Sequence, residues 1–163
     1  MERKVKLLNG TLDVALRLLA IMTTCKTQMT EERIAIYSYF VIHISDLRNS
    51  EKSAHPDIPF RSNGYMKSRE VIQSALNLLI SRGLLDCDFT SKDIKYFASD
   101  MGCAFYESVG CEYKTLLVKN INKVHRTLDK MSDLQLSDIV SANLHTWGSE
   151  FKYESILNDI EYE

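Results

Sequence analysis

The stretch LLDCDFTSKDIKYFAS, residues 84–99, decides the fold that this sequence predicts. It contains two runs in which apolar and charged side chains alternate, separated by the polar turn TSKD. The alternating apolar residues are Leu85, Cys87 and Phe89 in the first run and Ile94, Tyr96 and Ala98 in the second. Alternation of this kind is typical of β-strands that place one face on a core, so the stretch predicts a β-hairpin.

Three helices are expected before the hairpin. Apolar residues recur at helical spacing over residues 12–22 and 30–46, and Thr30 with two glutamates after it is typical of a helix N-terminus. A third helix is expected from about residue 67 to residue 82, where Gly83 supplies the C-cap. Residues 47–66 hold both prolines and predict a long connection. Three helices followed by a hairpin is the order of a winged-helix domain.

Two more helices are expected after the hairpin, over about residues 99–109 and 113–131. The predicted fold class is therefore mainly α with a small β-hairpin. We expect a winged-helix-like core over residues 1–99 and a helical C-terminal extension over residues 100–163 that packs on it. The extension ends in an acidic tail, residues 150–163, which contains Glu150, Glu154, Asp159, Glu161 and Glu163 against Lys152.

Composition limits the class of function. The chain has 163 residues, of which 45% are hydrophobic, enough for one domain with its own core. With 20 basic and 22 acidic residues the formal charge is −2, which excludes binding to nucleic acid through a global excess of positive charge. No apolar stretch is long enough to span a membrane, and the start MERKVKLLNG lacks the apolar run of a signal peptide. We therefore expect a cytoplasmic protein without a membrane partner.

The four cysteines, Cys25, Cys87, Cys103 and Cys111, lie far apart and form no CxxC pair. Each has apolar or aromatic neighbours in the sequence. This pattern favours buried free thiols over a zinc site or a disulfide framework. No metal and no cofactor is expected.

A basic face is predicted on the helix KTLLVKNINKVHRTLDKM, residues 114–131. Its apolar stripe consists of Leu117, Ile121, Val124, Leu128 and Met131. Lys119, Lys123, Arg126 and Lys130 repeat with the same spacing on the other side of the axis. Two interpretations stay open: a solvated surface that balances the acidic tail, and a contact with DNA or with an acidic partner.

The third helix does not look like a reader of DNA. Its polar stripe is Glu70, Gln73, Asn77 and Ser81, and Asp86, Asp88 and Asp93 follow in the hairpin. Phosphate groups would meet carboxylates at the positions where winged-helix domains present basic residues. The sequence therefore favours a winged-helix domain that binds protein.

Two histidine and aspartate pairs are candidates for chemistry: His43 with Asp46, and His55 with Asp57. Imidazole and carboxylate can hold a metal or exchange protons. No third ligand and no nucleophile motif accompanies them, so no catalytic residues are expected. The segment His-Pro-Asp-x-Pro is stiff at two φ angles and is suited to docking a partner.

Several short segments lie in one order along residues 9–107: NGTLDVALRLL (residues 9–19), VIHISDL (41–47), AHPDIPFRS (54–62), the helix that contains Arg69, LLISRGLL (78–85) and KYFAS (95–99). Together they resemble the middle-component family of ABC-three-component systems, which is related to the third component of Lamassu defence. The loop segment is the most specific part of the resemblance. One position departs from the family: Ser38 stands where an acidic residue is expected in the middle of the second helix.

The resemblance implies a non-catalytic subunit of a bacterial defence complex against viruses and plasmids. Such a subunit bridges an SMC- or Rad50-like ATPase and an effector, often a nuclease, that stays inactive until foreign DNA is sensed. Contact with DNA is then expected to be weak or indirect. The residues expected to bind a partner are His43, Asp46, His55, Asp57, Phe60 and Arg61.

Two other functions stay open at this point. One is a winged-helix transcription regulator that binds DNA. The other is a metal-dependent enzyme, which would need a metal bound through the same histidines and aspartates.

Overall fold

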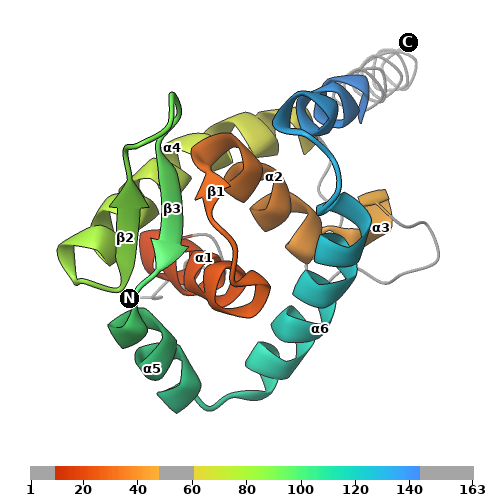
Figure 1. Ribbon diagram of the computed structural model, residues 1–163. Coiled ribbons are helices and arrows are strands. Elements are labelled where there is room, and N and C mark those ends of the chain that lie inside the picture. Colours follow the sequence, from red (N-terminus) through yellow and green to blue (C-terminus); the bar gives the residue numbers. More distant parts are fainter. Residues whose placement is uncertain (1–9, 48–60, 144–163) are drawn as a thin grey trace, which may run out of the picture.

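The computed structural model describes residues 10–47 and 61–143, and in residues 61–67 the backbone only. This part of the chain is mostly helical with one small antiparallel sheet, which confirms the predicted fold class (Figure 1). The elements in chain order are α1 (Thr11–Cys25), β1 (Met29–Thr30), α2 (Glu31–Ile42), α3 (Ile44–Leu47), α4 (Arg61–Ser81), β2 (Leu85–Asp88), β3 (Lys95–Ala98), α5 (Asp100–Ser108), α6 (Glu112–Leu128) and a last helix over residues 133–143.

The predicted hairpin is present, and the sheet has a third strand that the sequence did not reveal. Strand β3 lies in the middle, pairing with β2 on one side and with β1 on the other. The register places Leu85 opposite Ala98, and Met29 opposite Tyr96. Strand β1 is two residues long, too short for an alternating pattern to be recognised. Apart from the short helix α3, the order of α1, β1, α2, α4, β2 and β3 agrees with a winged-helix core, and that classification stays a prediction.

Two helix boundaries follow the predicted capping residues, Thr30 and Gly83, and Ser99 caps a further helix. The Thr30 side chain accepts a hydrogen bond from the Arg33 N–H at the start of α2, and the Ser99 side chain accepts one from the Gly102 N–H at the start of α5. Gly83 follows the end of α4 with φ 71°, a conformation that glycine adopts without strain.

The predicted boundaries of α4 and α6 are wrong. Helix α4 begins at Arg61 rather than near residue 67, so the connection before it is shorter than expected. Its first turns read RSNGYM, a polar stretch with a glycine that carries no apolar stripe. The helix expected over residues 113–131 ends at Leu128. The division into residues 1–99 and 100–163 stays a prediction.

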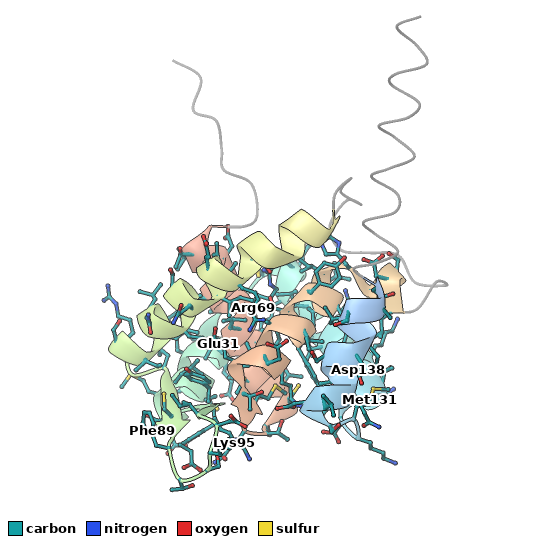
Figure 2. The ribbon with its side chains drawn as sticks, turned by 90° about the horizontal axis from the view of Figure 1, so that it is seen from above. Glu31, Arg69, Phe89, Lys95, Met131 and Asp138 are labelled. Carbon is teal, nitrogen blue, oxygen red and sulfur yellow. The ribbon has the colours of Figure 1, made fainter. Side chains whose placement is uncertain are left out.

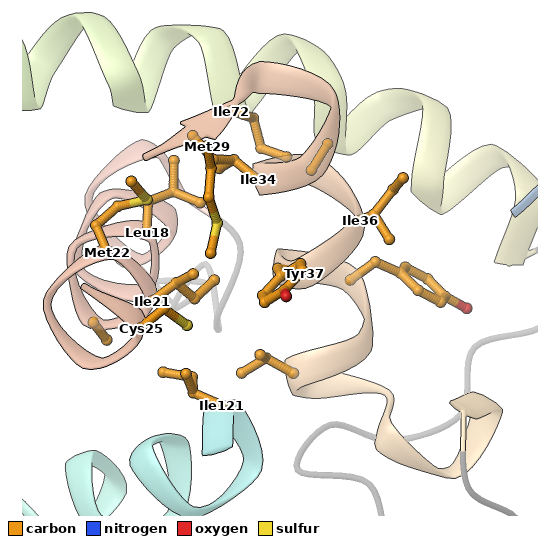
Figure 3. Close-up of a cluster of buried hydrophobic side chains, with 14 of the residues drawn as sticks. Leu18, Ile21, Met22, Cys25, Met29, Ile34, Ile36, Tyr37, Ile72 and Ile121 are labelled. Carbon is orange, nitrogen blue, oxygen red and sulfur yellow. The ribbon is translucent and has the colours of Figure 1, made fainter. Parts of the chain in front are cut away.

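The core lies between α1, α2, α4 and α6. Figure 3 shows Tyr37 of α2 among side chains of α1, with Ile121 of α6 close below them. Four members of the predicted apolar stripe of α6 are buried: Leu117, Ile121, Val124 and Leu128. The fifth, Met131, is half-buried and lies after the end of the helix. Helix α1 contacts both α4 and α6, and Figure 3 shows these two helices on opposite sides of the cluster.

Some apolar residues expected in the core are at the surface. Leu12 is 65% exposed at the start of α1, and Phe89 is 71% exposed because β2 ends at Asp88 and the chain turns. Cys25 is buried, Cys87 and Cys103 are half-buried and Cys111 is exposed, so the prediction of four buried thiols holds for Cys25 alone. All four cysteines are free.

One close backbone approach fixes α5 against the end of α4. A Cβ atom placed on Gly102 would lie 2.0 Å from the carbonyl oxygen of Leu84. Only glycine allows this distance. None of the helices in the described part of the chain is long and apolar enough to cross a membrane.

Candidate functional site

The end of α2 brings two of the predicted partner-binding residues together. The backbone leaves the helical conformation at His43 (φ −119°, ψ 53°), and α3 starts at Ile44. The Tyr39 hydroxyl donates a hydrogen bond to Oδ2 of Asp46 over 2.6 Å, and the Tyr39 and His43 ring centroids are 4.8 Å apart. The expected single helix through residue 46 is therefore wrong, and Tyr39 is the group that joins the two residues.

His43 and Asp46 differ in exposure. The His43 side chain is buried, with 7% of the residue exposed, whereas Asp46 is half-buried. The Asp46 side chain is therefore partly accessible at the surface, whereas the His43 ring lies inside the protein. Sequence spacing alone treated the two residues as equivalent, because helical periodicity does not reveal a break between them.

The other predicted partner-binding residues give less structural information. His55, Asp57 and Phe60 lie outside the described residues. Arg61 is the first residue of α4, and its backbone alone is described. The segment that connects Asp46 to Arg61 begins in α3 and ends at the first residue of α4.

The predicted basic face is on the surface of α6. Lys119 and Arg126 are exposed on the helix, Lys123 is half-buried, and Lys130 is exposed in the turn that follows Leu128. The opposite face of α6 is anchored by Asn120, whose side-chain N–H donates to the carbonyl oxygen of Val41 over 3.0 Å. The four basic residues thus project from a helix that is fixed on the core.

The polar stripe of α4 and the hairpin carboxylates are also at the surface. Glu70, Gln73, Asn77, Ser81, Asp86 and Asp93 are exposed. The carboxylate of Asp88 accepts hydrogen bonds from the N–H and the hydroxyl of Thr90, which lowers the pKa of this carboxyl group. Asp88 therefore shapes the hairpin turn and also keeps a negative charge there.

A polar cleft of about 270 Å³ was missed by the sequence interpretation. It is lined by Thr27, Gln28, Thr30, Arg33, Lys95, Asp129 and Asp133. Nε of Arg33 donates to Oδ1 of Asp133 over 2.8 Å, and the Thr30 hydroxyl donates to Oδ2 of the same carboxylate over 2.8 Å. One sequence feature could have indicated the cleft. A glutamate three positions after Thr30 would complete a capping box, but this chain has Arg33 there, which binds Asp133 instead.

An apolar cleft of about 380 Å³ lies between α1, the end of α4 and α5. Its lining consists of Leu12, Ala15, Leu16, Leu78, Leu79, Arg82, Leu84 and Phe105. Leu12 is 65% exposed and Phe105 is 43% exposed, although both are large and apolar. Exposed apolar side chains that gather around a cleft are typical of surfaces that bind another protein.

Among the described residues, no three histidine, cysteine, aspartate or glutamate side chains lie close enough together to hold a metal ion. Burial raises the pKa of the Cys25 thiol to about 12, and the negative charge of Asp129 adds to this shift. Cys25 is therefore protonated at neutral pH, the form in which a thiol is a weak nucleophile.

Comparison with known proteins gives one match. Residues 7–150 match the model of a family described as ABC-three component (ABC-3C) system Middle Component 2. No curated protein matches the chain. No solved structure matches it.

Proposed function

The chain belongs to the ABC-three component (ABC-3C) system Middle Component 2 family, and from this premise we propose that it is a non-catalytic bridge between two partner proteins. The partners we propose are an SMC- or Rad50-like ATPase and an effector nuclease of a bacterial defence complex. The bridge helps to keep the effector inactive until foreign DNA is sensed. The observation that carries the proposal is the family match over residues 7–150.

A bridge needs two separate surfaces, and the described part of the chain offers two of different chemistry. One is the apolar cleft of α1, α4 and α5, with Leu12 and Phe105 at its rim. The other is the basic face of α6, with Lys119 and Arg126. Figure 1 shows α5 and the hairpin on one side of α1 and α6 on the other side. Two partners could therefore bind at the same time without sharing residues.

Besides these two surfaces, we assign a third and more specific partner contact to residues between the end of α2 and the start of α4, because the family resemblance is strongest there. It comprises His43, Asp46, His55, Asp57, Phe60 and Arg61. Asp46 supports the assignment, since its half-buried carboxylate is held in one orientation by Tyr39. A fixed carboxylate recognises a basic partner group at a lower entropic cost than a freely rotating one.

The experiment that tests the proposal is co-purification of the tagged chain, expressed together with its neighbouring genes. We expect a large ATPase to be retained. Asp57→Ala should reduce the retained amount more than Lys123→Ala does. Failure to retain any large ATPase contradicts the bridge, and equal effects of the two substitutions show that the contact lies elsewhere.

A winged-helix transcription regulator is the second candidate, favoured by the order of helices and strands around the sheet. Its specific property is binding of a palindromic DNA site by a homodimer of the isolated chain. A gel-shift experiment with a pool of random duplexes separates the two functions. Selection of a palindrome by the chain alone favours the regulator, and the absence of any selected site favours the bridge.

A further inference from the structure

Arg17 is a buried arginine on the inner side of α1, with 4% of the residue exposed. Its Nε donates a hydrogen bond to the hydroxyl oxygen of Ser38 on α2 over 3.0 Å. Within the described residues no carboxylate forms an ion pair with it. A buried charge is costly unless an opposite charge or several hydrogen bonds compensate it, and one serine hydroxyl compensates little.

The nearest carboxylate on the same helix belongs to Asp13, and it lies toward the start of α1. Asp13 Oδ2 is 3.8 Å from the position that a Cβ atom would take at Gly10. Asp13 is exposed, and its charge acts on Arg17 only from a distance. Burial lowers the pKa of the Arg17 guanidinium, while Tyr113 and Asp13 act in the opposite direction. The charge balance at Arg17 is thus incomplete within the described part of the chain.

Arg17 lines a cavity of about 130 Å³ between α1, the end of α5 and α6. The other lining residues are Asp13, Leu16, Tyr106, Val109, Cys111, Tyr113, Lys114 and Leu117. Most of this wall is apolar. Its charged residues are two cations, Arg17 and Lys114, and one exposed carboxylate, Asp13. Lys114 is already occupied, since its ammonium group donates to the carbonyl oxygen of Tyr106 over 2.7 Å. Arg17 also lines the cavity, and among the described residues its side chain makes no hydrogen bond besides the one from Nε to Ser38.

Tyr106 adds a second polar group with an incomplete hydrogen-bond balance. The residue is 7% exposed, and its hydroxyl has no hydrogen-bond partner among the described residues. A buried hydroxyl without a hydrogen-bond partner destabilises the folded protein. Arg17 and Tyr106 come from α1 and α5, so a group that satisfies both would also tie these two helices together.

We propose that this cavity binds a small carboxylate with a short apolar stem, which Arg17 holds through its terminal N–H groups. The planar pair of carboxylate oxygens fits the edge of a guanidinium group whose Nε is engaged elsewhere. Leu16, Val109 and Leu117 provide apolar walls for the stem. A phosphate would place its remaining charged oxygens against the same apolar walls, so the cavity selects a carboxylate.

Two sources supply such a group: a free short-chain carboxylic acid, and the side chain of a glutamate or aspartate on a partner protein. The inference does not depend on the bridging function, because the isolated chain already contains the cavity. Sodium butyrate is the probe, with 1-butanol and sodium chloride as controls for the stem and for ionic strength. At ten times its dissociation constant, butyrate should lower the unfolding equilibrium constant about eleven-fold.

Two variants make the experiment decisive. Arg17→Met removes the charge while keeping an unbranched side chain, and Ser38→Asp supplies a carboxylate next to Nε from inside the protein. Both should remove the butyrate effect, and Ser38→Asp should also raise the melting temperature of the ligand-free chain. If Arg17→Met does not fold, Ser38→Asp decides alone. The proposal is overturned if butyrate does not stabilise the natural chain, or if 1-butanol stabilises it equally. It is also overturned if butyrate stabilises Ser38→Asp as much as the natural chain.

The complex with the partner subunits distinguishes the two sources. If a partner carboxylate fills the cavity, butyrate no longer stabilises the chain in the complex, and Ser38→Asp weakens assembly. If a free acid is the ligand, butyrate stabilises the chain equally in both states, and Ser38→Asp leaves assembly unchanged.

Discussion

Arg33 and Asp133 form an ion pair with 2.8 Å between Nε and Oδ1, and it connects residues that are 100 positions apart in the chain. The Arg33 guanidinium also donates to the carbonyl oxygens of Leu128 and Met131. These contacts join the start of α2 to the turn before the helix of residues 133–143. Figure 2 shows Met131 and Asp138 of this region on the opposite side of α2 from Phe89 of the hairpin.

Asp133→Ala should destabilise the protein by about 1–3 kcal/mol, because it leaves Nε of the half-buried Arg33 side chain and the Thr30 hydroxyl without their acceptor. Asp138→Ala is the matched control: Asp138 is exposed on the same helix. Thermal unfolding of both variants measures the difference. Hydrogen exchange should become faster in residues 133–143 of Asp133→Ala only. Equal behaviour of the two variants would show that the ion pair does not hold this helix.

Gly102→Ala should reduce stability by about 1–3 kcal/mol or more, since the added methyl group would lie 2.0 Å from the Leu84 carbonyl oxygen, a backbone atom that cannot move freely. Gly110→Ala is the control, because no atom lies within 4 Å of the corresponding position. The melting temperatures of the two variants give the comparison. A Gly102→Ala protein as stable as Gly110→Ala would contradict the close approach of α5 to residue 84.

Alkaline pH should destabilise the fold. Burial raises the pKa of Cys25 and of Tyr37 to about 12 in the folded chain. In the unfolded chain a thiol loses its proton near pH 8.5 and a phenol near pH 10. Above these values the unfolded state binds fewer protons than the folded state, so the free energy of unfolding falls as pH rises toward about 12.

Urea unfolding at pH 7, 9 and 10.5 measures this slope, and Cys25→Ala should make it shallower between pH 8.5 and 10. A thiol reagent at pH 8 provides an independent check. The exposed Cys111 should react first, and Cys25 only after unfolding. Rapid labelling of Cys25 in the folded protein would show that its surroundings are more open than described.

The double reversal Lys119→Glu with Arg126→Glu should leave the weak retention of DNA by the isolated chain unchanged across a salt series. Both side chains are exposed on α6, so the fold should tolerate the change. In the bridging account the partner proteins make the contacts with DNA. A direct contact by both residues would lower the slope of log affinity against log salt by about 1.8. A change of that size would place DNA on α6 and contradict this part of the account.

The sequence predicted those elements of the fold whose apolar residues follow one regular spacing. Alternation located β2 and β3, and the spacing of Leu117, Ile121 and Val124 identified the buried side of α6. Strand β1 could not be found, because two residues carry no period and it is a strand only through its pairing with β3. The start of α4 was placed too late for a related reason: its first turns lack an apolar stripe.

The candidate surfaces were predictable where charge repeats along one helix, as on α6. Contacts between distant elements were not. The Arg33 pair with Asp133 and the Arg17 bond to Ser38 depend on how α2 packs against other helices, and neither leaves a local signal. The exposed position of Leu12 was also hidden, since helical spacing marks a stripe without showing whether a neighbour covers its first turn.

In the proposed bridge the chain connects an ATPase to an effector. The most direct measurement is reconstitution of the system with a tag on the ATPase, in the presence and absence of this chain. We expect the effector to co-purify with the ATPase only when the chain is present, with all three proteins in a fixed ratio. Co-purification of the ATPase and the effector in its absence, in the same amount, would contradict the bridge.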